Sequence, residues 1–211
     1  MLDYITIQNY QSDNHLLFLD TETTGLPKGR YSKPEDISKF NTARLVELGY
    51  IICKGDGTIV EKVFDIIKPT DFVIDNNSYA VRKCHGITKE KANREGKDLD
   101  LILKKLEKNI KKYKVNKMIA HNMDFDSRII LSECYRYNYT DIINRIKNTS
   151  LECTMKMGKI YNKGKWPKLE VLYKKLLNRE YKHEHRAMPD TKCCMECYFK
   201  MILVDTLEIE K

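Results

Sequence analysis

A run of apolar residues that ends in two carboxylates constrains this chain more than any other feature. Residues 16–19 are Leu-Leu-Phe-Leu, and the sequence DTETTG follows from position 20. An uninterrupted apolar run predicts a strand buried on both faces, here 16–20. Because alternate residues of an extended chain share a face, Asp20 and Glu22 are expected on the same side. Buried carboxylates need neutralisation, which a divalent cation supplies; the alternative is a turn-forming pair with Glu22 in solvent.

Length and charge restrict the class of protein. A chain of 211 residues predicts one domain with a full-sized core. Its 38 Lys and Arg exceed its 30 Asp and Glu, which gives a formal net charge of +8. Such an excess favours a polyanionic partner, nucleic acid first, although a basic surface can also serve solubility alone.

The seven cysteines indicate a reducing compartment. Their count is odd and their spacing irregular, which favours reduced thiols in a cytoplasmic or nuclear protein. Cys194 and Cys197 could form half of a zinc site, but no second pair has a suitable spacing, so helix packing is favoured. No apolar run reaches membrane-spanning length, and the first residues do not resemble a secretory signal.

The order of elements predicts one α/β domain over residues 1–211. Strands at 44–53 and 58–67 form a hairpin around Gly55-Asp56-Gly57. Further strands are expected at 118–120 and 150–153. Two short helical pieces lie within 76–94, with Thr88 as a cap. Longer helices are expected at 98–112, from the 121–126 segment to about 137, at 140–147, at 166–177 with Pro167 in the first turn, and at 186–204. An N-terminal arm (1–14), a long mobile loop (27–43) and a C-terminal tail (205–211) complete the chain. This order predicts a mixed β-sheet flanked by helices.

Three further polar residues are candidates to join the two carboxylates. Asp126 follows a buried strand and opens a helix; Asp124 competes with it, and one of the two is expected to cap the helix while the other faces the cleft. His185 and Asp190 would point about 140° apart on one regular helix. They converge only if His185 lies at or before the helix start, which Pro189 supports because proline is tolerated in a first turn. Asp190 then lies at the positive end of the helix dipole.

Together these motifs resemble those of the DEDDh, or DnaQ-like, 3′→5′ exonucleases of the ribonuclease H-like superfamily. The resemblance begins with Asp20-x-Glu22, Asp126 within HNMDFD, and His185-x4-Asp190. The segments RLVELGYII, HGIT and PKLEVLYKKLL also resemble family segments in family order, so that the likeness covers roughly residues 16–200. Cys153 departs from the pattern, since many members have Asp there. The resemblance implies a ribonuclease H-like mixed sheet in a single domain.

The resemblance also implies a reaction. Members hydrolyse phosphodiester bonds at the 3′ end of nucleic acid, with two divalent cations, Mg²⁺ or Mn²⁺, bound by carboxylates. By resemblance the metal ligands are Asp20, Glu22, Asp126 and Asp190, with Asp20 bridging the metals, and His185 is the general base on the attacking water. Single strands are favoured over duplexes, because the terminal nucleotide must be splayed to reach a narrow cleft.

Substrate contacts follow from the same likeness. Family members hold the terminal nucleotide with groups that follow the Asp-x-Glu strand, and an apolar side chain wedges against its base. Here these residues are Thr23, Thr24, Gly25 and Leu26, with Leu26 as the wedge, and His85 and Asn122 resemble positions near the nucleotide. A packing role explains these six residues nearly as well. His121 is expected to be structural, and the basic residues Lys28, Arg30, Lys33 and Lys39 are placed to touch the strand being digested.

Two other classes of protein are open. A haloacid-dehalogenase-like phosphatase also places acids after an apolar strand, but it needs Asp-x-Asp, and Glu22 occupies the second place. The other is a non-catalytic nucleic-acid-binding module that kept the fold, against which the complete acid set argues. The choice between DNA and RNA depends on contacts to the 2′-hydroxyl, which the sequence does not define. A polymerase or other protein partner and the oligomeric state are open as well.

Overall fold

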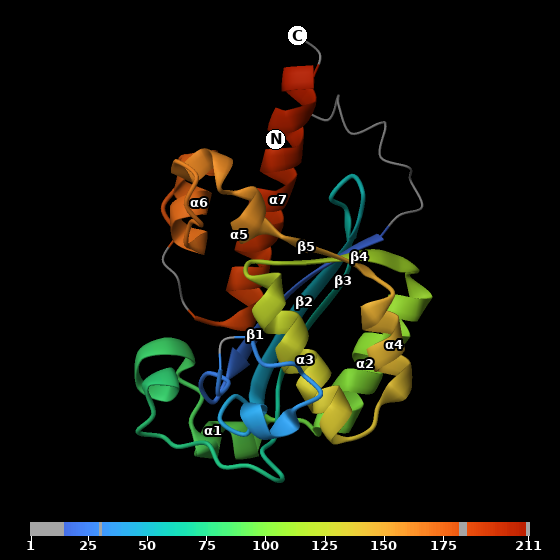
Figure 1. Ribbon diagram of the computed structural model, residues 1–211, viewed down its shortest axis with the longest axis vertical. Helices are drawn as coiled ribbons and strands as arrows, with labels where there is room; N and C mark the ends of the chain where they lie inside the picture. Colours follow the sequence, from blue (N-terminus) through green and yellow to red (C-terminus); the bar gives the residue numbers. More distant parts are fainter. Residues whose placement is uncertain (1–14, 30, 182–184, 210–211) are drawn as a thin grey trace.

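A five-stranded mixed sheet forms the centre of the protein (Figure 1). The computed structural model describes residues 15–29, 31–181 and 185–209, and side chains of the last helix as far as Leu203. The expected arm at 1–14 and Arg30 therefore lie outside the described residues. The strands are β1 (His15–Thr23), β2 (Leu45–Lys54), β3 (Ile59–Ile66), β4 (Val115–Ala120) and β5 (Ser150–Cys153), in the sheet order β3-β2-β1-β4-β5.

Helices cover both faces of this sheet (Figure 1). The α-helices are α1 (Lys89–Glu95), α2 (Leu99–Lys112), α3 (Met123–Arg136), α4 (Thr140–Lys147), α5 (Thr154–Met157), α6 (Leu169–Leu177) and α7 (Ala187–Ile209). Short helical turns are η1 (Ile37–Phe40), η2 (Ala80–His85) and η3 (Ile160–Asn162). The predicted mixed sheet flanked by helices is confirmed. Among the described residues, none of these helices is long and apolar enough to cross a membrane.

The central strand is longer than the predicted 16–20. β1 runs antiparallel to β2 and parallel to β4, and it continues to Thr23 because Asp20 and Glu22 pair with Gly49 and Glu47 of β2. Both carboxylates therefore lie within the strand, held by the ladder on the β2 side. Their positions are set by sheet hydrogen bonds, which makes them more rigid than residues of a turn would be.

Successive side chains of β1 alternate between the two faces of the sheet and so pack in two different cores. Leu17 and Leu19 pack in the core that α2, α3 and α4 cover, whereas Leu16 and Phe18 pack against α6 and α7. The same alternation continues past the apolar run, because successive residues of a strand point to opposite faces. Asp20 and Glu22 thus lie on the α7 side, and the threonine between them lies on the α3 side.

The core on the α7 side contains most of the cysteines. Cys193, Cys194 and Cys197 of α7 are buried there, with 3%, 1% and 0% of their surface exposed. All seven cysteines are free thiols. The group of described residues that could hold a metal ion contains no cysteine. Cys194 and Cys197 thus pack in the core, as the sequence favoured.

Some predicted element boundaries need correction. Thr88 caps α1 as predicted, since its hydroxyl accepts a hydrogen bond from Lys91 N at 3.2 Å. The placement of Pro167 in the first turn of α6 is wrong, because Lys168 is extended and the helix begins at Leu169. The expected tail at 205–211 is also wrong as far as Ile209, where α7 ends. No Gly or Pro occurs between position 190 and the last residue to stop that helix earlier.

The loop 27–43 is held against α3, which differs from the mobile loop that we expected. Its turn η1 buries Phe40 completely. Arg136 donates a hydrogen bond to the carbonyl of Ile37 at 3.1 Å, and the Tyr135 hydroxyl donates one to Glu35 at 2.9 Å. The basic side chains Lys28, Lys33 and Lys39 are exposed, as the substrate-contact hypothesis requires.

A buried ion pair joins α3 to the sheet. Glu133 of α3, 1% exposed, accepts hydrogen bonds from Arg44 Nε at 2.8 Å and from the Leu45 backbone at 3.1 Å. Arg44 is 3% exposed and also pairs with Asp71 at 2.9 Å. A buried, fully hydrogen-bonded pair of this kind fixes register more than it adds stability. It anchors α3 beside the start of β2 and so places the first turn of the helix near the end of β1.

Candidate active site

Three carboxylates from two distant segments meet at the end of β1. One oxygen each from Asp20, Glu22 and Asp190 lies within 4.8 Å of the other two. Asp190 belongs to the first turn of α7 and is 3% exposed. The structure thus brings together three of the four predicted metal ligands, on the face of β1 that α7 covers.

The fourth carboxylate reaches the site from the α3 side. Asp126 is 3% exposed, and its Oδ1 accepts hydrogen bonds from the Thr21 backbone at 3.0 Å and the Thr21 hydroxyl at 2.7 Å. Thr21 lies between Asp20 and Glu22 in β1. The hydrogen bonds to Thr21 therefore hold Asp126 beside the other three acids without placing it inside the tightest group.

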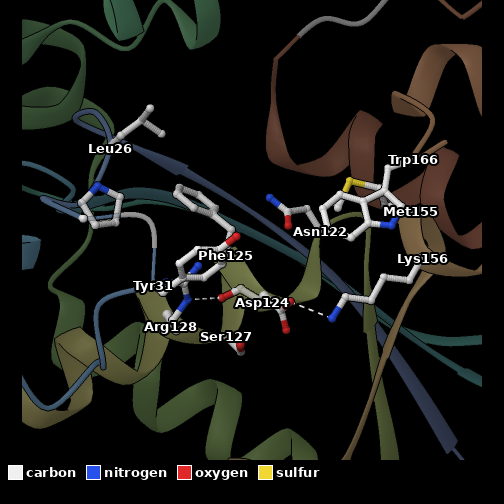
Figure 2. Close-up of a pocket in the computed structure, with 12 residues that line it drawn as sticks. Leu26, Tyr31, Asn122, Asp124, Phe125, Ser127, Arg128, Met155, Lys156 and Trp166 are labelled. Atoms are coloured by element: carbon white, nitrogen blue, oxygen red, sulfur yellow. Dashed lines mark hydrogen bonds and ion pairs between the residues drawn. The ribbon is translucent and has the colours of Figure 1, made fainter.

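Asp124 points elsewhere. Its side chain is 63% exposed and forms an ion pair of 2.7 Å with Lys156, drawn as a dashed line in Figure 2. The N-cap position of α3 is Asn122, in a left-handed conformation (φ 84°), and it makes no side-chain cap. The expectation that Asp124 or Asp126 caps the helix is therefore wrong, whereas Asp126 does face the other acids.

Burial and mutual repulsion disfavour ionisation of these acids. Burial raises the pKa of Asp20 well above its usual range, and the charges of Asp126, Asp190 and Glu22 raise it further. Burial, followed by the charge of Asp190, raises the pKa of Glu22 to about 9. Burial also raises the pKa of Asp126 to about 7, although the hydrogen bonds from Thr21 oppose this. Four converging oxygen ligands that cannot all ionise alone are a donor set suited to a hard divalent cation.

These pKa shifts predict how stability responds to pH when divalent cations are removed. The folded state retains protons on Glu22 and Asp126 that unfolded carboxyls release at lower pH. A raised acid pKa contributes stability that is fully present below the unfolded pKa and is lost as pH rises through the folded pKa. We expect the melting temperature in EDTA to fall from about pH 5 to about pH 9, and Mg²⁺ to raise it most at the upper end.

The control for this expectation is Glu22→Gln, which removes one of the shifted groups. The melting temperature of this variant in EDTA should fall less steeply over the same pH range. A wild-type melting temperature that stays level or rises with pH in EDTA, with no larger effect of Mg²⁺ at high pH, would contradict the electrostatic account.

The start of α7 is fixed on β2 by a buried carboxylate. Glu47 has no exposed surface; it accepts hydrogen bonds from Arg186 Nη2 at 2.6 Å and Nε at 2.9 Å, and from the Ala187 backbone at 2.8 Å. Gly49 allows close approach, because a Cβ there would lie 2.8 Å from the Ala187 carbonyl carbon. β2 thereby places the residues at both sides of the helix start, His185 before it and Asp190 within it.

His185 precedes the helix, as the sequence argument required. Its backbone has a φ of 47°, and α7 begins two residues later at Ala187. A positive φ is uncommon for a residue with a side chain, so the neighbouring contacts of Arg186 must hold this conformation. Asp190 is held in turn by the Tyr181 hydroxyl, which donates a hydrogen bond to its Oδ1.

Sequence reasoning missed Thr21, Glu47 and Tyr181 as partners of the acids. For Glu47 a signal existed, because it is the one carboxylate within the run RLVELGYII and it pairs opposite Glu22. The contacts of Thr21 and Tyr181 depend on which faces of β1 and α7 meet, and no local pattern shows this.

The predicted substrate-binding residues fall into two groups. In the first, the threonine hydroxyls shape the turn after β1: Thr23 donates to the Gly25 carbonyl at 2.7 Å and Thr24 to the Thr42 carbonyl at 3.1 Å. In the second, Leu26 (75% exposed) and Asn122 line a cavity of about 760 Å³ (Figure 2). Leu26 and Asn122 can therefore meet a ligand, whereas the two hydroxyls are engaged within the chain.

His85 stabilises the turn after β1 through a buried hydrogen bond. It is 4% exposed; Ile87 N donates to its Nδ1 at 2.9 Å, so its Nε2 carries the proton and donates to the Thr23 carbonyl at 3.1 Å. Burial lowers the pKa of His85 to about 4, which keeps the ring neutral. Both ring nitrogens are thus occupied, and His85 can act on a nucleotide only through the position of Thr23.

His121 is structural, as expected. Its Nε2 lies 3.1 Å from the Pro167 carbonyl, which can only accept, and its Nδ1 lies 3.0 Å from the Thr154 hydroxyl. The ring therefore donates to Pro167 through Nε2 and connects the end of β4 to the first residue of α5 and to the segment that precedes α6.

The sheet order and the acids on its central strand define a ribonuclease H-like nuclease fold. The model of the RNase_T family, described as exonuclease, matches residues 17–198, and the chain belongs to this family. This membership overturns the haloacid-dehalogenase-like alternative. A search of curated proteins finds no match.

Solved structures agree on the fold. Exonuclease I in its apo form superposes with a TM-score of 0.63 at 20% identity over 90% of this chain and 42% of the other. E. coli exonuclease I in complex with a dA16 oligonucleotide gives 0.63 at 19% identity, over 90% and 40%. S. pombe Pop2p with Mg²⁺ and Mn²⁺ bound gives 0.62 at 13% identity, over 88% and 82%. The chain thus spans about two fifths of the length of exonuclease I.

Proposed function

We propose that this chain is a divalent-metal-dependent 3′→5′ exonuclease that acts on single-stranded ends of nucleic acid. The observation that carries this proposal is the convergence of Asp20, Glu22 and Asp190, with Asp126 beside them, in a chain of the RNase_T exonuclease family. The non-catalytic alternative leaves unexplained why four carboxylates, three of them with raised pKa values, are kept together.

The acids would hold the metal ions. Asp20, Glu22, Asp126 and Asp190 offer the oxygen ligands that Mg²⁺ and Mn²⁺ prefer. Two such ions, when bound, activate a water molecule and neutralise charge on the phosphoryl group during an in-line displacement. Thr21 and Tyr181 orient two of the carboxylates by hydrogen bonds, so these ligands are preorganised before any metal binds.

His185 would be the general base. It lies just before α7, on a segment that Glu47 fixes through Arg186, and it is five residues from Asp190. A histidine in this position can accept the proton of the attacking water and pass it to solvent. The proposal assigns the chemistry to His185 and the positioning of its backbone to Glu47 and Arg186.

Support for a nucleic-acid substrate comes from charge and from the relatives. The chain has a formal net charge of +8, and Lys28, Lys33 and Lys39 are exposed on the loop that follows β1. One similar structure, E. coli exonuclease I, holds a dA16 oligonucleotide, and another, Pop2p, holds Mg²⁺ and Mn²⁺. For this chain we infer the same class of ligand and cofactor, with Leu26 wedged against the terminal base.

End-labelled substrates test the direction of digestion. We expect 5′-labelled single-stranded DNA or RNA to shorten through a ladder of products in Mg²⁺ or Mn²⁺, while a 3′ label is released at once as a mononucleotide. EDTA should stop both. Release of the 5′ label first, or no release from DNA or RNA with either metal, would overturn the proposal, and comparison of the two nucleic acids would identify the substrate.

A further inference from the structure

A cavity near the acids is lined by aromatic and basic side chains that have no role in the proposed chemistry. Figure 2 shows Leu26 and Tyr31 on one side, Trp166 and Lys156 on the other, and the first turn of α3 with Phe125 between them. Its volume of about 760 Å³ falls in the range of small-molecule sites, about 300–1,000 Å³. None of Tyr31, Phe125, Lys156 and Trp166 contributes to the acid group.

The apolar side chains around this cavity remain exposed. Tyr31 is 81% exposed, Trp166 49% and Leu26 75%. Large apolar side chains gathered around a hollow mark a binding surface, because isolated exposure is common but clustering is not. Aromatic rings in such a place suit nucleobases, since every base offers a π-face for stacking whatever its sequence.

Two cationic side chains, Lys156 and Arg128, line the same cavity. Lys156 pairs with Asp124 at 2.7 Å, but both side chains are substantially exposed, at 49% and 63%. An ion pair in contact with water is weak, so Lys156 can exchange the Asp124 carboxylate for a phosphate at little cost. Lys159 adds positive charge 6.0 Å from the centre of the Trp166 ring. The Trp166 side of the cavity can thus meet both a base and its phosphate.

The first turn of α3 connects the cavity to the acid group. Asp126 turns towards Thr21 of β1, whereas its neighbours Asp124 and Phe125 line the cavity. Leu26, the proposed wedge for the terminal base, lines the cavity and lies three residues after the end of β1, the strand of Asp20 and Glu22. A strand whose last phosphodiester lies at the acids can therefore extend over Phe125 towards either Tyr31 or Trp166.

We propose that this cavity binds the second and third nucleotides from the 3′ end, with bases stacked on Trp166 and Tyr31 and a phosphate on Lys156. This inference rests on the proposed function and adds a substrate requirement to it. Stacking needs unpaired bases, so efficient digestion requires a single-stranded end of at least three nucleotides. Asp124 weakens binding in this arrangement, because it competes with the phosphate for Lys156.

Kinetics on oligonucleotides of increasing length test the site. With oligothymidylates and oligouridylates of two to ten nucleotides, Trp166→Ala should raise KM about tenfold on substrates of three or more, with kcat unchanged and a smaller effect on dinucleotides, which lack the third nucleotide. Lys156→Ala should raise KM and lower the salt dependence of binding by about one counterion. Asp124→Asn should act in the opposite direction and lower KM, which a merely structural residue would not do.

Intrinsic fluorescence gives a readout that needs no turnover. Trp166 is the only tryptophan of the chain, so emission excited at a wavelength that tyrosine does not absorb reports on this cavity alone. With Asp20→Asn in Mg²⁺, which binds without cleavage, oligothymidylate or oligouridylate of three or more nucleotides should quench the emission, and dinucleotides should quench it less. Leu101→Ala and Lys108→Ala on α2 are matched controls, because both side chains are exposed away from the cavity and should leave KM unchanged.

The outcomes separate this inference from the proposed function. Digestion by the wild type, together with unchanged KM for Trp166→Ala and Lys156→Ala at every length and no quenching, would overturn the subsite and leave the exonuclease intact. Quenching by oligonucleotides of three or more in a chain that digests no substrate would refute the exonuclease and keep the binding site.

Discussion

Replacement of Asp20 by Asn should abolish metal-dependent hydrolysis while the protein stays folded. Asp20 belongs to the acid group at the end of β1, and its ionised form is disfavoured by burial and by Asp126, Asp190 and Glu22. Asp20 would hold a metal ion, so loss of its carboxylate should remove several kcal/mol of transition-state stabilisation, which corresponds to a rate loss of about 10³-fold or more. Single-turnover hydrolysis of labelled single strands measures this loss.

The same variant should gain stability when no metal is present. Asn has nearly the shape of Asp but no charge, so the repulsion among the remaining acids decreases. We expect a higher melting temperature than wild type in EDTA at neutral pH, and a smaller increase on addition of Mg²⁺. Asp141→Asn, on the exposed surface of α4, is the matched control and should change neither rate nor metal response. Metal-stimulated turnover by Asp20→Asn near the wild-type rate would refute the assignment of Asp20.

The parts of the site that local patterns encode could be predicted from the sequence. The apolar run and the period of two place Asp20 and Glu22 on one face of β1, and the structure has them there. Pro189 sets the start of α7, which in turn puts His185 before the helix and Asp190 in its first turn. These inferences succeeded because each depends on the backbone geometry of a few consecutive residues.

The contacts that hold the acids in place could not be predicted in this way. Glu47 and Arg186 are 139 positions apart, and Thr21 and Asp126 are 105 apart. Their pairing follows from the register of β1 against β2 and from the helices packed on each face, which only the complete sheet determines. The structural role of His85 could not be predicted for the same reason. Its ring is buried and contacts the Thr23 carbonyl, and it belongs to a helical segment whose position the sequence does not reveal.

The loop after β1 shows the limit of composition as a guide. Its charges and lack of periodicity suggested a mobile segment, yet Phe40 is fully buried and Ile37 is tied to α3. Burial of one aromatic side chain offsets the entropy of about one or two ordered residues, so the loop also depends on the hydrogen bonds that join Glu35 and Ile37 to α3. The loop is therefore an ordered segment that borders the proposed substrate path.

Replacement of His185 by Ala should lower kcat by about 10²–10⁴-fold and leave metal binding largely intact. His185 is not part of the carboxylate group that could hold a metal ion, so the increase in melting temperature with Mg²⁺ should match that of wild type. KM should change little, because the proposed nucleotide contacts lie on other residues. Addition of imidazole should restore part of the rate, since a free base can replace the missing side chain.

A second variant is needed to separate loss of the proposed base from a change in the unusual backbone conformation of His185. Its φ of 47° is held by the docking of Arg186 on Glu47, and alanine adopts such a conformation less readily than asparagine does. His185→Asn therefore preserves the backbone while it removes the base. If His185 supplies the base, both variants lose rate to a similar extent and only imidazole restores it; a near-wild-type rate for His185→Asn would mean that the residue serves the helix start alone.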